Sequence, residues 1–125
     1  RKHGVSVAGL CEVGNLNDKI ISENYLLPDY HSPLYHQGGR GLMIYIKSDL
    51  TYIPMPDLNT DNSLWVNIKV RNTSILFGVH YRSPSMNVNE ENVYFDHLRE
   101  NLSKASKIKC DHLIINGDFN SKHQK

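Results

Sequence analysis

Apolar and polar positions alternate most clearly in the middle of the chain. Two runs, 64–70 and 74–82, follow a period of two, and the short polar segment 71–73 separates them. This pattern predicts two antiparallel strands joined as a hairpin. In the second strand one face would carry Ile75, Phe77, Val79 and Tyr81. The other face would carry Leu76, Gly78, His80 and Arg82.

Further strands are expected on both sides of this hairpin. Apolar runs predict them at 5–11, 42–47 and 112–116. The polar, turn-rich segment 15–35 is expected to form a long loop with one short strand at 25–27. Residues 51–53 are expected to continue the strand 42–47 until Pro54 stops it.

One amphipathic helix is predicted between the hairpin and the last strand. Asn87 is a suitable N-cap, and acidic residues follow in the first turn. The apolar stripe of this helix comprises Tyr94, Leu98, Leu102 and Ala105. Strands followed by a helix and another strand indicate an α/β (α+β) domain with a sheet core.

Composition indicates a soluble globular chain of one domain. Of its 125 residues 39% are hydrophobic and 22% charged, and the formal charge of +1 gives no global attraction for nucleic acid. Cys11 and Cys110 are expected to be free buried thiols, with a disulfide between them as the alternative. No membrane span or signal peptide is visible. The chain starts without Met and stops soon after Asn120, so we expect a fragment of a longer polypeptide.

The strongest chemical signal follows the last apolar run. Asp118 and Asn120 stand two residues apart, so an extended backbone places both side chains on one face and Phe119 on the other, toward the core. A carboxylate beside a carboxamide suits the binding of a metal ion and a phosphate. Glu12 also ends an apolar strand, which indicates either a site at a sheet edge or a solvated loop carboxylate.

Taken together, three strand ends resemble the endonuclease/exonuclease/phosphatase superfamily, which includes apurinic endonucleases and deoxyribonuclease I. They are Glu12, the Tyr81-Arg82-Ser83-Pro84 turn and the Gly117-Asp118-Phe119-Asn120 segment. The chain is most similar to the endonuclease domains of non-LTR (LINE-type) retrotransposons, which read Glu-Thr-Trp, Gly-Gly-Gly-Val-Ala-Ile-Tyr, Tyr-Arg-Pro-Pro and Gly-Asp-Phe-Asn. The glycine-rich stretch 39–45 corresponds to the second of these. Val13-Gly14 departs from Thr-Trp after the acid.

This resemblance implies a fold, a reaction and partners. The fold would be part of a four-layered sandwich of mixed, mostly antiparallel sheets. Residues 1–125 would be a single incomplete domain that lacks the N-terminal strand and the C-terminal strands. The reaction would be hydrolysis of DNA phosphodiesters with Mg²⁺, or alternatively Mn²⁺. A reverse-transcriptase domain would lie in the same polypeptide, acting inside the cell and in the nucleus, and this fragment alone would be inactive.

The resemblance also implies roles for named residues. Glu12 would bind the metal ion. Asp118, Asn120 and Tyr81 would be catalytic, and Arg82 and Asn120 would contact the substrate phosphate or DNA. Two alternatives stay open: a phosphoesterase of the superfamily acting on a small-molecule or lipid phosphate, and an inactive relic or interaction module, which Val13-Gly14 favours.

Overall fold

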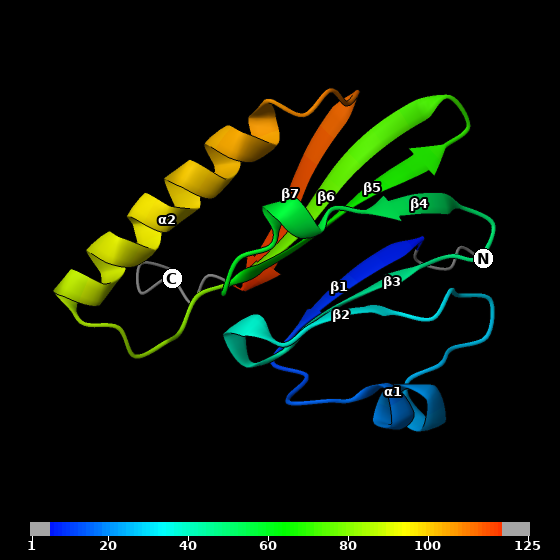
Figure 1. Ribbon diagram of the computed structural model, residues 1–125, viewed down its shortest axis with the longest axis horizontal. Helices are drawn as coiled ribbons and strands as arrows, with labels where there is room; N and C mark the ends of the chain where they lie inside the picture. The colour runs from blue at the N-terminus through cyan, green and yellow to red at the C-terminus, as the bar shows by residue number, and fades with distance from the viewer. Residues whose placement is uncertain (1–5, 119–125) are drawn as a thin grey trace, which may run out of the picture.

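Seven strands and two α-helices follow one another in residues 6–118, the part of the chain that this computed structural model describes (Figure 1). The strands are β1 (Val7–Cys11), β2 (Leu34–His36), β3 (Leu42–Ile46), β4 (Thr51–Pro54), β5 (Ser63–Val70), β6 (Thr73–Tyr81) and β7 (His112–Asp118). The α-helices are α1 (Asp18–Asn24) and α2 (Val88–Ser106). Two short 3-10 helices, η1 (Gly38–Arg40) and η2 (Pro56–Leu58), lie in the connections.

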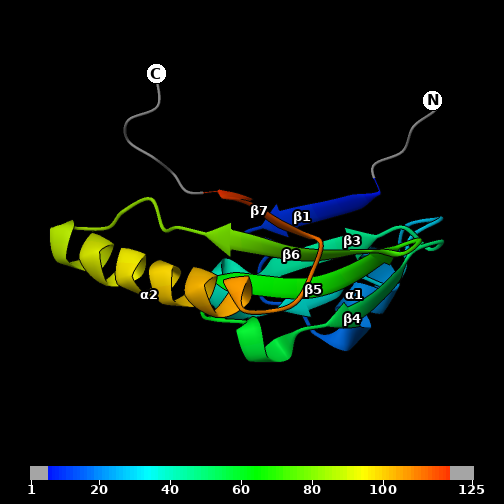
Figure 2. The same ribbon diagram turned by 90° about the horizontal axis from the view of Figure 1, so that it is seen from above.

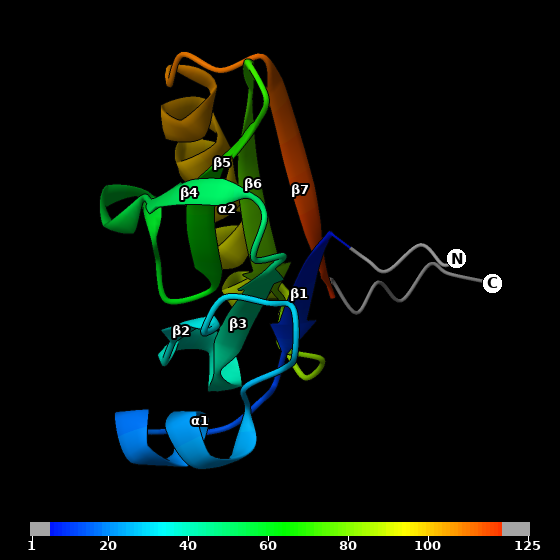
Figure 3. The ribbon, with the colours of Figure 1, turned by 90° about the vertical axis from the view of Figure 1, so that its right-hand side faces the viewer.

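The strands form two sheets that pack face to face. One has the order β1-β3-β2 and is antiparallel, and the other has the order β4-β5-β6-β7, in which β7 runs parallel to β6. Helix α2 provides the crossover from β6 to β7 and covers the outer face of the second sheet, while α1 covers the outer face of the first (Figure 3). The predicted four-layered α/β arrangement with mixed sheets is therefore confirmed.

The main core lies between the two sheets, and the strand periodicity explains it. Leu42, Ile44 and Ile46 of β3 face the inward side chains of β5 and β6. The alternate residues Met43 and Tyr45 pack against α1 on the outer side. Because both of its faces are covered, every residue of β3 is buried.

Helix α2 begins and packs as its sequence predicts. The Asn87 side chain accepts a hydrogen bond from the Glu90 N–H at 2.8 Å, and the Glu90 side chain accepts one from the Asn87 N–H at 2.9 Å. This reciprocal capping box satisfies two donors that a helix N-terminus leaves free. The buried face of α2 includes Ala105, which packs against Trp65 and Leu76 of the sheet.

Two sequence predictions about secondary structure are wrong. Residues 25–27 do not form a strand. The loop predicted at 15–35 contains α1 instead, capped by the Asn17 side chain, which accepts from the Ile20 N–H. The prediction missed this helix because seven residues give little periodicity. Residues 51–53 do not continue β3, since β4 pairs with β5 in the other sheet. Pro54 fits there because β4 is an edge strand.

Strands β1 and β7 contact each other at one side of the sandwich (Figure 2). Each is the edge strand of its sheet within residues 6–118. Leu113, Ile114 and Ile115 of β7 are 38–44% exposed, although such a continuous apolar run is typical of a strand covered on both faces. This side therefore presents an open apolar edge. None of the described helices is long and apolar enough to cross a membrane.

Candidate functional site

Three predicted segments come together where β1, β6 and β7 end. Glu12 directly follows β1, Tyr81 ends β6, and Asp118 ends β7. Because β6 and β7 are parallel, Tyr81 and Asp118 are partners in register. The Tyr81 hydroxyl donates a hydrogen bond to Oε2 of Glu12 at 2.7 Å. The structure thus brings the acid after β1, the phenol and the end of β7 to one place.

Tyr81 is held firmly by its surroundings. Its side chain lies in the core between the sheets, and the residue is only 2% exposed. Its backbone N–H donates to the carbonyl of Asn62 at 2.9 Å, which ties the end of β6 to the segment before β5. The phenol is therefore fixed at its base, while its hydroxyl reaches the half-exposed Glu12 carboxylate.

Glu12 occupies an unusual backbone conformation. Its φ of 58° lies in the left-handed region, which side chains other than glycine adopt at a cost. The Arg40 Nη1 lies 3.7 Å from Oε2 of Glu12, and the two side chains are 67% and 46% exposed. At this exposure the ion pair adds little stability, about 0–1 kcal/mol. What it does is hold a positive charge next to the carboxylate.

The glycine-rich segment before β3 supports Glu12 from the side. The Val13 N–H donates to the Gly41 carbonyl at 3.1 Å, and the Gly14 N–H donates to the Arg40 carbonyl at 2.9 Å. A Cβ on Gly41 would lie 2.3 Å from the Gly14 oxygen, and the φ of Gly41 is 93°. The segment is a tight turn that carries Arg40.

The other predicted site residues are placed differently. Arg82 is 6% exposed, makes an ion pair with Glu91 and lies 5.4 Å from the centre of the Phe95 ring, so it faces α2. The contact of Arg82 with phosphate stays a prediction. The side chain of Asp118 and the whole of Asn120 lie outside the described part of the chain.

Sequence reasoning missed Asn101. This residue is 5% exposed on the buried face of α2, where its side chain hydrogen-bonds to the sheet. It stands seven residues after Tyr94 and four before Ala105, both buried. A polar residue at that spacing within an apolar stripe was the available signal. Cys11 and Cys110 form no disulfide, as expected, but both are only partly buried.

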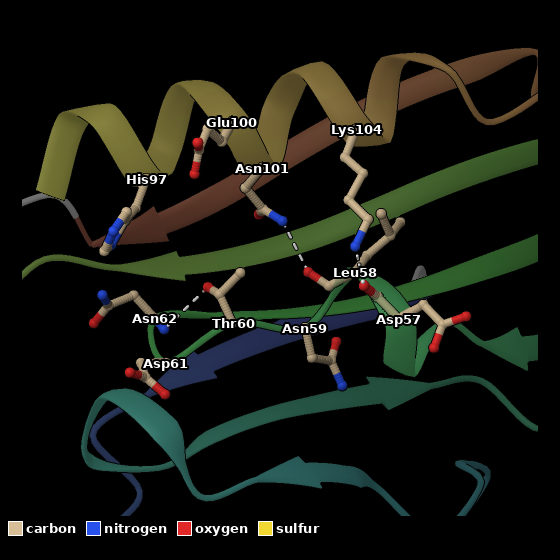
Figure 4. Close-up of a pocket in the computed structure, with 10 residues that line it drawn as sticks. All are labelled: Asp57, Leu58, Asn59, Thr60, Asp61, Asn62, His97, Glu100, Asn101 and Lys104. Carbon is tan, nitrogen blue, oxygen red and sulfur yellow. Dashed lines mark hydrogen bonds between the residues drawn. The ribbon is translucent and has the colours of Figure 1, made fainter.

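A polar cavity of about 370 Å³ lies between α2 and the segment 57–62 (Figure 4). Asp57, Asp61 and Glu100 contribute carboxylates to its lining, against the single ammonium of Lys104. In Figure 4 the Asn101 amide points to the Leu58 carbonyl, to which it donates at 2.8 Å. An excess of carboxylates repels a phosphate. The site where β1, β6 and β7 end, called the mouth below, therefore suits an anionic substrate better than this cavity.

The described residues offer a divalent ion one carboxylate at this mouth. Among the described side chains no three His, Cys, Asp or Glu residues group closely enough to hold a metal ion. Oε2 of Glu12 accepts from Tyr81, and Oε1 makes no hydrogen bond to a described residue. A hard, half-exposed oxygen of this kind fits Mg²⁺, which typically takes one or two protein carboxylates and keeps several waters.

Comparison with known proteins identifies the family of the chain. The profile of the Endonuclease/Exonuclease/phosphatase family matches residues 1–125. No curated protein matches. Among solved structures, the endonuclease domain of TRAS1, a telomere-specific non-LTR retrotransposon, is similar in fold, with a TM-score of 0.58 and 24% identity over 78% of this chain. The match covers 44% of that domain, so the chain spans less than half of its length. The predicted family is confirmed: the chain belongs to the endonuclease/exonuclease/phosphatase family.

Proposed function

We propose that this chain is the central part of a metal-dependent endonuclease domain of the retrotransposon type, which nicks DNA by hydrolysing a phosphodiester. The observation that carries the proposal is the 2.7 Å hydrogen bond between Tyr81 and Glu12, next to the strand that delivers Asp118. The family includes nucleases and phosphatases. The Tyr81-Arg82-Ser83-Pro84 turn and the fold of the TRAS1 domain favour DNA as the substrate.

Tyr81 and Glu12 have complementary tasks in this proposal. The Tyr81 hydroxyl orients the Glu12 carboxylate so that Oε1 remains available to hold Mg²⁺ or Mn²⁺. Because the hydroxyl carries one proton, it donates to Glu12 before substrate binds and turns to a phosphoryl oxygen as negative charge develops there. Removing one such donor typically lowers the rate by about 10²–10³-fold.

The end of β7 supplies the remaining groups. Asp118 accepts the proton of the attacking water, and Asn120 holds that water or a phosphoryl oxygen. When bound, the divalent ion polarises the phosphoryl group and neutralises charge on the leaving oxygen. Arg82 contacts the DNA backbone only if it leaves Glu91, so we assign it a secondary role.

We further propose that the domain is larger than these 125 residues. The apolar edges of β1 and β7 are then covered by additional strands, which also complete the catalytic set. The described residues alone would have little nuclease activity. A reverse-transcriptase domain in the same polypeptide and action in the nucleus belong to the same proposal.

A titration of the chain with Mg²⁺ and with Mn²⁺ tests the metal role without requiring catalysis. We expect the side-chain ¹³C resonance of Glu12 to shift with Mg²⁺, Mn²⁺ to broaden it, and Glu12→Gln to abolish both responses. Glu100→Gln, which removes a carboxylate of the acidic cavity, is the matched control and should leave the Glu12 response intact. A metal response that survives Glu12→Gln at the mouth, or no response at Glu12 in the unmodified chain, would contradict the assignment.

The reaction itself requires a polypeptide in which the domain is complete. There Asp118→Ala should reduce nicking of supercoiled plasmid by orders of magnitude while the protein stays folded. Inositol phosphates serve as the competing substrates. Near-normal nicking by Asp118→Ala would remove Asp118 from the mechanism, and preferential hydrolysis of inositol phosphates would replace the nuclease with a small-molecule phosphoesterase.

A further inference from the structure

The buried polar network beneath α2 converges on one carboxamide. Oδ1 of Asn101 accepts three hydrogen bonds, from Ser63 Oγ at 3.1 Å, Trp65 Nε1 at 2.9 Å and His80 Nε2 at 3.0 Å. Its Nδ2 donates to the Leu58 carbonyl. These contacts connect α2 with η2, β5 and β6. A carboxamide whose oxygen and nitrogen are both engaged, on a residue only 5% exposed, is rigidly held.

The network also fixes the orientation of His80. The indole of Trp65 can only donate and the Leu58 carbonyl can only accept, so the Asn101 amide has a single consistent orientation. Its oxygen therefore faces His80, whose Nε2 must carry a proton and donate it. The imidazole also packs edge-on against Trp65 with ring centres 5.3 Å apart. The His80 ring is thus held by two elements of the fold.

His80 links this network to the candidate site through its backbone. It directly precedes Tyr81, and its carbonyl oxygen accepts a hydrogen bond from the thiol of Cys11 at 3.6 Å. Cys11 directly precedes Glu12. Strands β1 and β6 belong to different sheets, yet they are joined at two successive positions, first by Cys11 with His80 and then by Glu12 with Tyr81.

We propose that Asn101 is a positioning residue of the site: through His80 it fixes the end of β6, and thereby the approach of the Tyr81 hydroxyl to the Glu12 carboxylate. Helix α2 would then control a contact that forms on the opposite face of β6. The catalytic role of that contact rests on the proposed function, whereas the contact itself is a feature of the structure.

Nuclear magnetic resonance of the 125-residue chain tests this directly. The ¹³Cζ resonance of Tyr81 and the ¹³Cδ resonance of Glu12 report on their hydrogen bond. We expect Asn101→Leu to shift both by more than their linewidths and to speed exchange of the Tyr81 hydroxyl proton. The matched control is Leu76→Val, which weakens the same packing of α2 on the sheet without touching the network. Unmoved Tyr81 and Glu12 resonances in Asn101→Leu, or equal shifts in Leu76→Val, would overturn the proposal.

A second pair of variants carries the test if Asn101→Leu does not fold. Cys11→Ala removes the donor to the His80 carbonyl, whereas Cys11→Ser keeps a donor at that place. We expect the alanine variant to shift the Tyr81 and Glu12 resonances and the serine variant to leave them close to their original positions. Equal behaviour of the two variants would refute the coupling between His80 and the site. Failure of the proposed function would appear separately, as an absent metal response at Glu12.

Discussion

Gly9 decides how closely the two sheets approach next to the candidate site. It lies in β1 on the face toward β6, two residues before Cys11. A Cβ built on Gly9 would lie 2.4 Å from Cγ2 of Val79. Carbon atoms in contact prefer about 3.5–4.0 Å. Gly9→Ala therefore cannot be accommodated unless β1 and β6 move apart by about 1 Å or Val79 changes its rotamer.

The expected effect combines two opposing terms. Overpacking of a filled core costs about 1–3 kcal/mol. The glycine has no left-handed φ, so alanine also restricts the unfolded chain, which returns about 0.4–1 kcal/mol. We expect a net loss of about 1–2 kcal/mol in the free energy of unfolding. Separation by about 1 Å would also stretch the Tyr81–Glu12 hydrogen bond of 2.7 Å beyond the normal limit for O–H···O.

Val79→Ala provides the matched rescue. It removes the methyl group at 2.4 Å and leaves the Val79 Cβ at 3.5 Å, an ordinary contact. The double variant should therefore be more stable than the sum of the two single effects by about 1–2 kcal/mol. Urea denaturation followed by fluorescence of Trp65, the single tryptophan and fully buried, measures this. Strictly additive effects would refute the steric argument, and an unchanged Tyr81 resonance in Gly9→Ala would refute the separation of β1 from β6.

Two further predictions concern pH and association. Burial lowers the pKa of His80 below the ordinary value of 6.5, against a smaller opposing effect of the Asn101 hydrogen bond, so the unfolded chain binds the proton more readily. The contribution of His80 to stability is therefore complete above pH 6.5 and decreases as pH falls below that value. Urea denaturation at several pH values should show that His80→Gln loses less stability on acidification than the unmodified chain. An equal loss in the two proteins would contradict this prediction. The β7 edge should cause concentration-dependent self-association in sedimentation velocity, which Ile114→Lys suppresses and Val88→Lys, at a more exposed apolar position on α2, does not.

Local pattern predicted most of the fold because each strand carries its own periodicity. The core-facing residues of β5 and β6 recur at every second position, and Asn87 with Glu90 specifies the start of α2 within four residues. Helix α1 was missed because Ile21 is the one buried residue among its seven, so the helix carries no apolar stripe. The sheet to which β4 belongs could not be predicted either, since pairing with β5 rather than β3 depends on the path of the connection.

The candidate site was predicted only in part, because its residues are visible in the sequence but their contacts are not. Glu12 and Tyr81 could be named because they end apolar strands and stand in stretches that resemble the motifs of the family. Their direct contact could not be deduced, because 69 residues separate them and they follow strands of different sheets. Asn101 was missed because a carboxamide in a helix is usually solvated, and its three donors come from positions that only the folded chain brings together.

The packing at Gly9 and the network at Asn101 constrain the same contact from different directions. Gly9 sets how far β1 stands from β6, and Asn101 sets how the end of β6 is oriented through His80. A hydrogen bond needs both the right distance and the right direction. With only one of these constraints, the Tyr81 hydroxyl would not be held in hydrogen-bonding geometry with the Glu12 carboxylate. The Gly9→Ala and Asn101→Leu variants should therefore perturb the same two resonances while acting on opposite faces of β6.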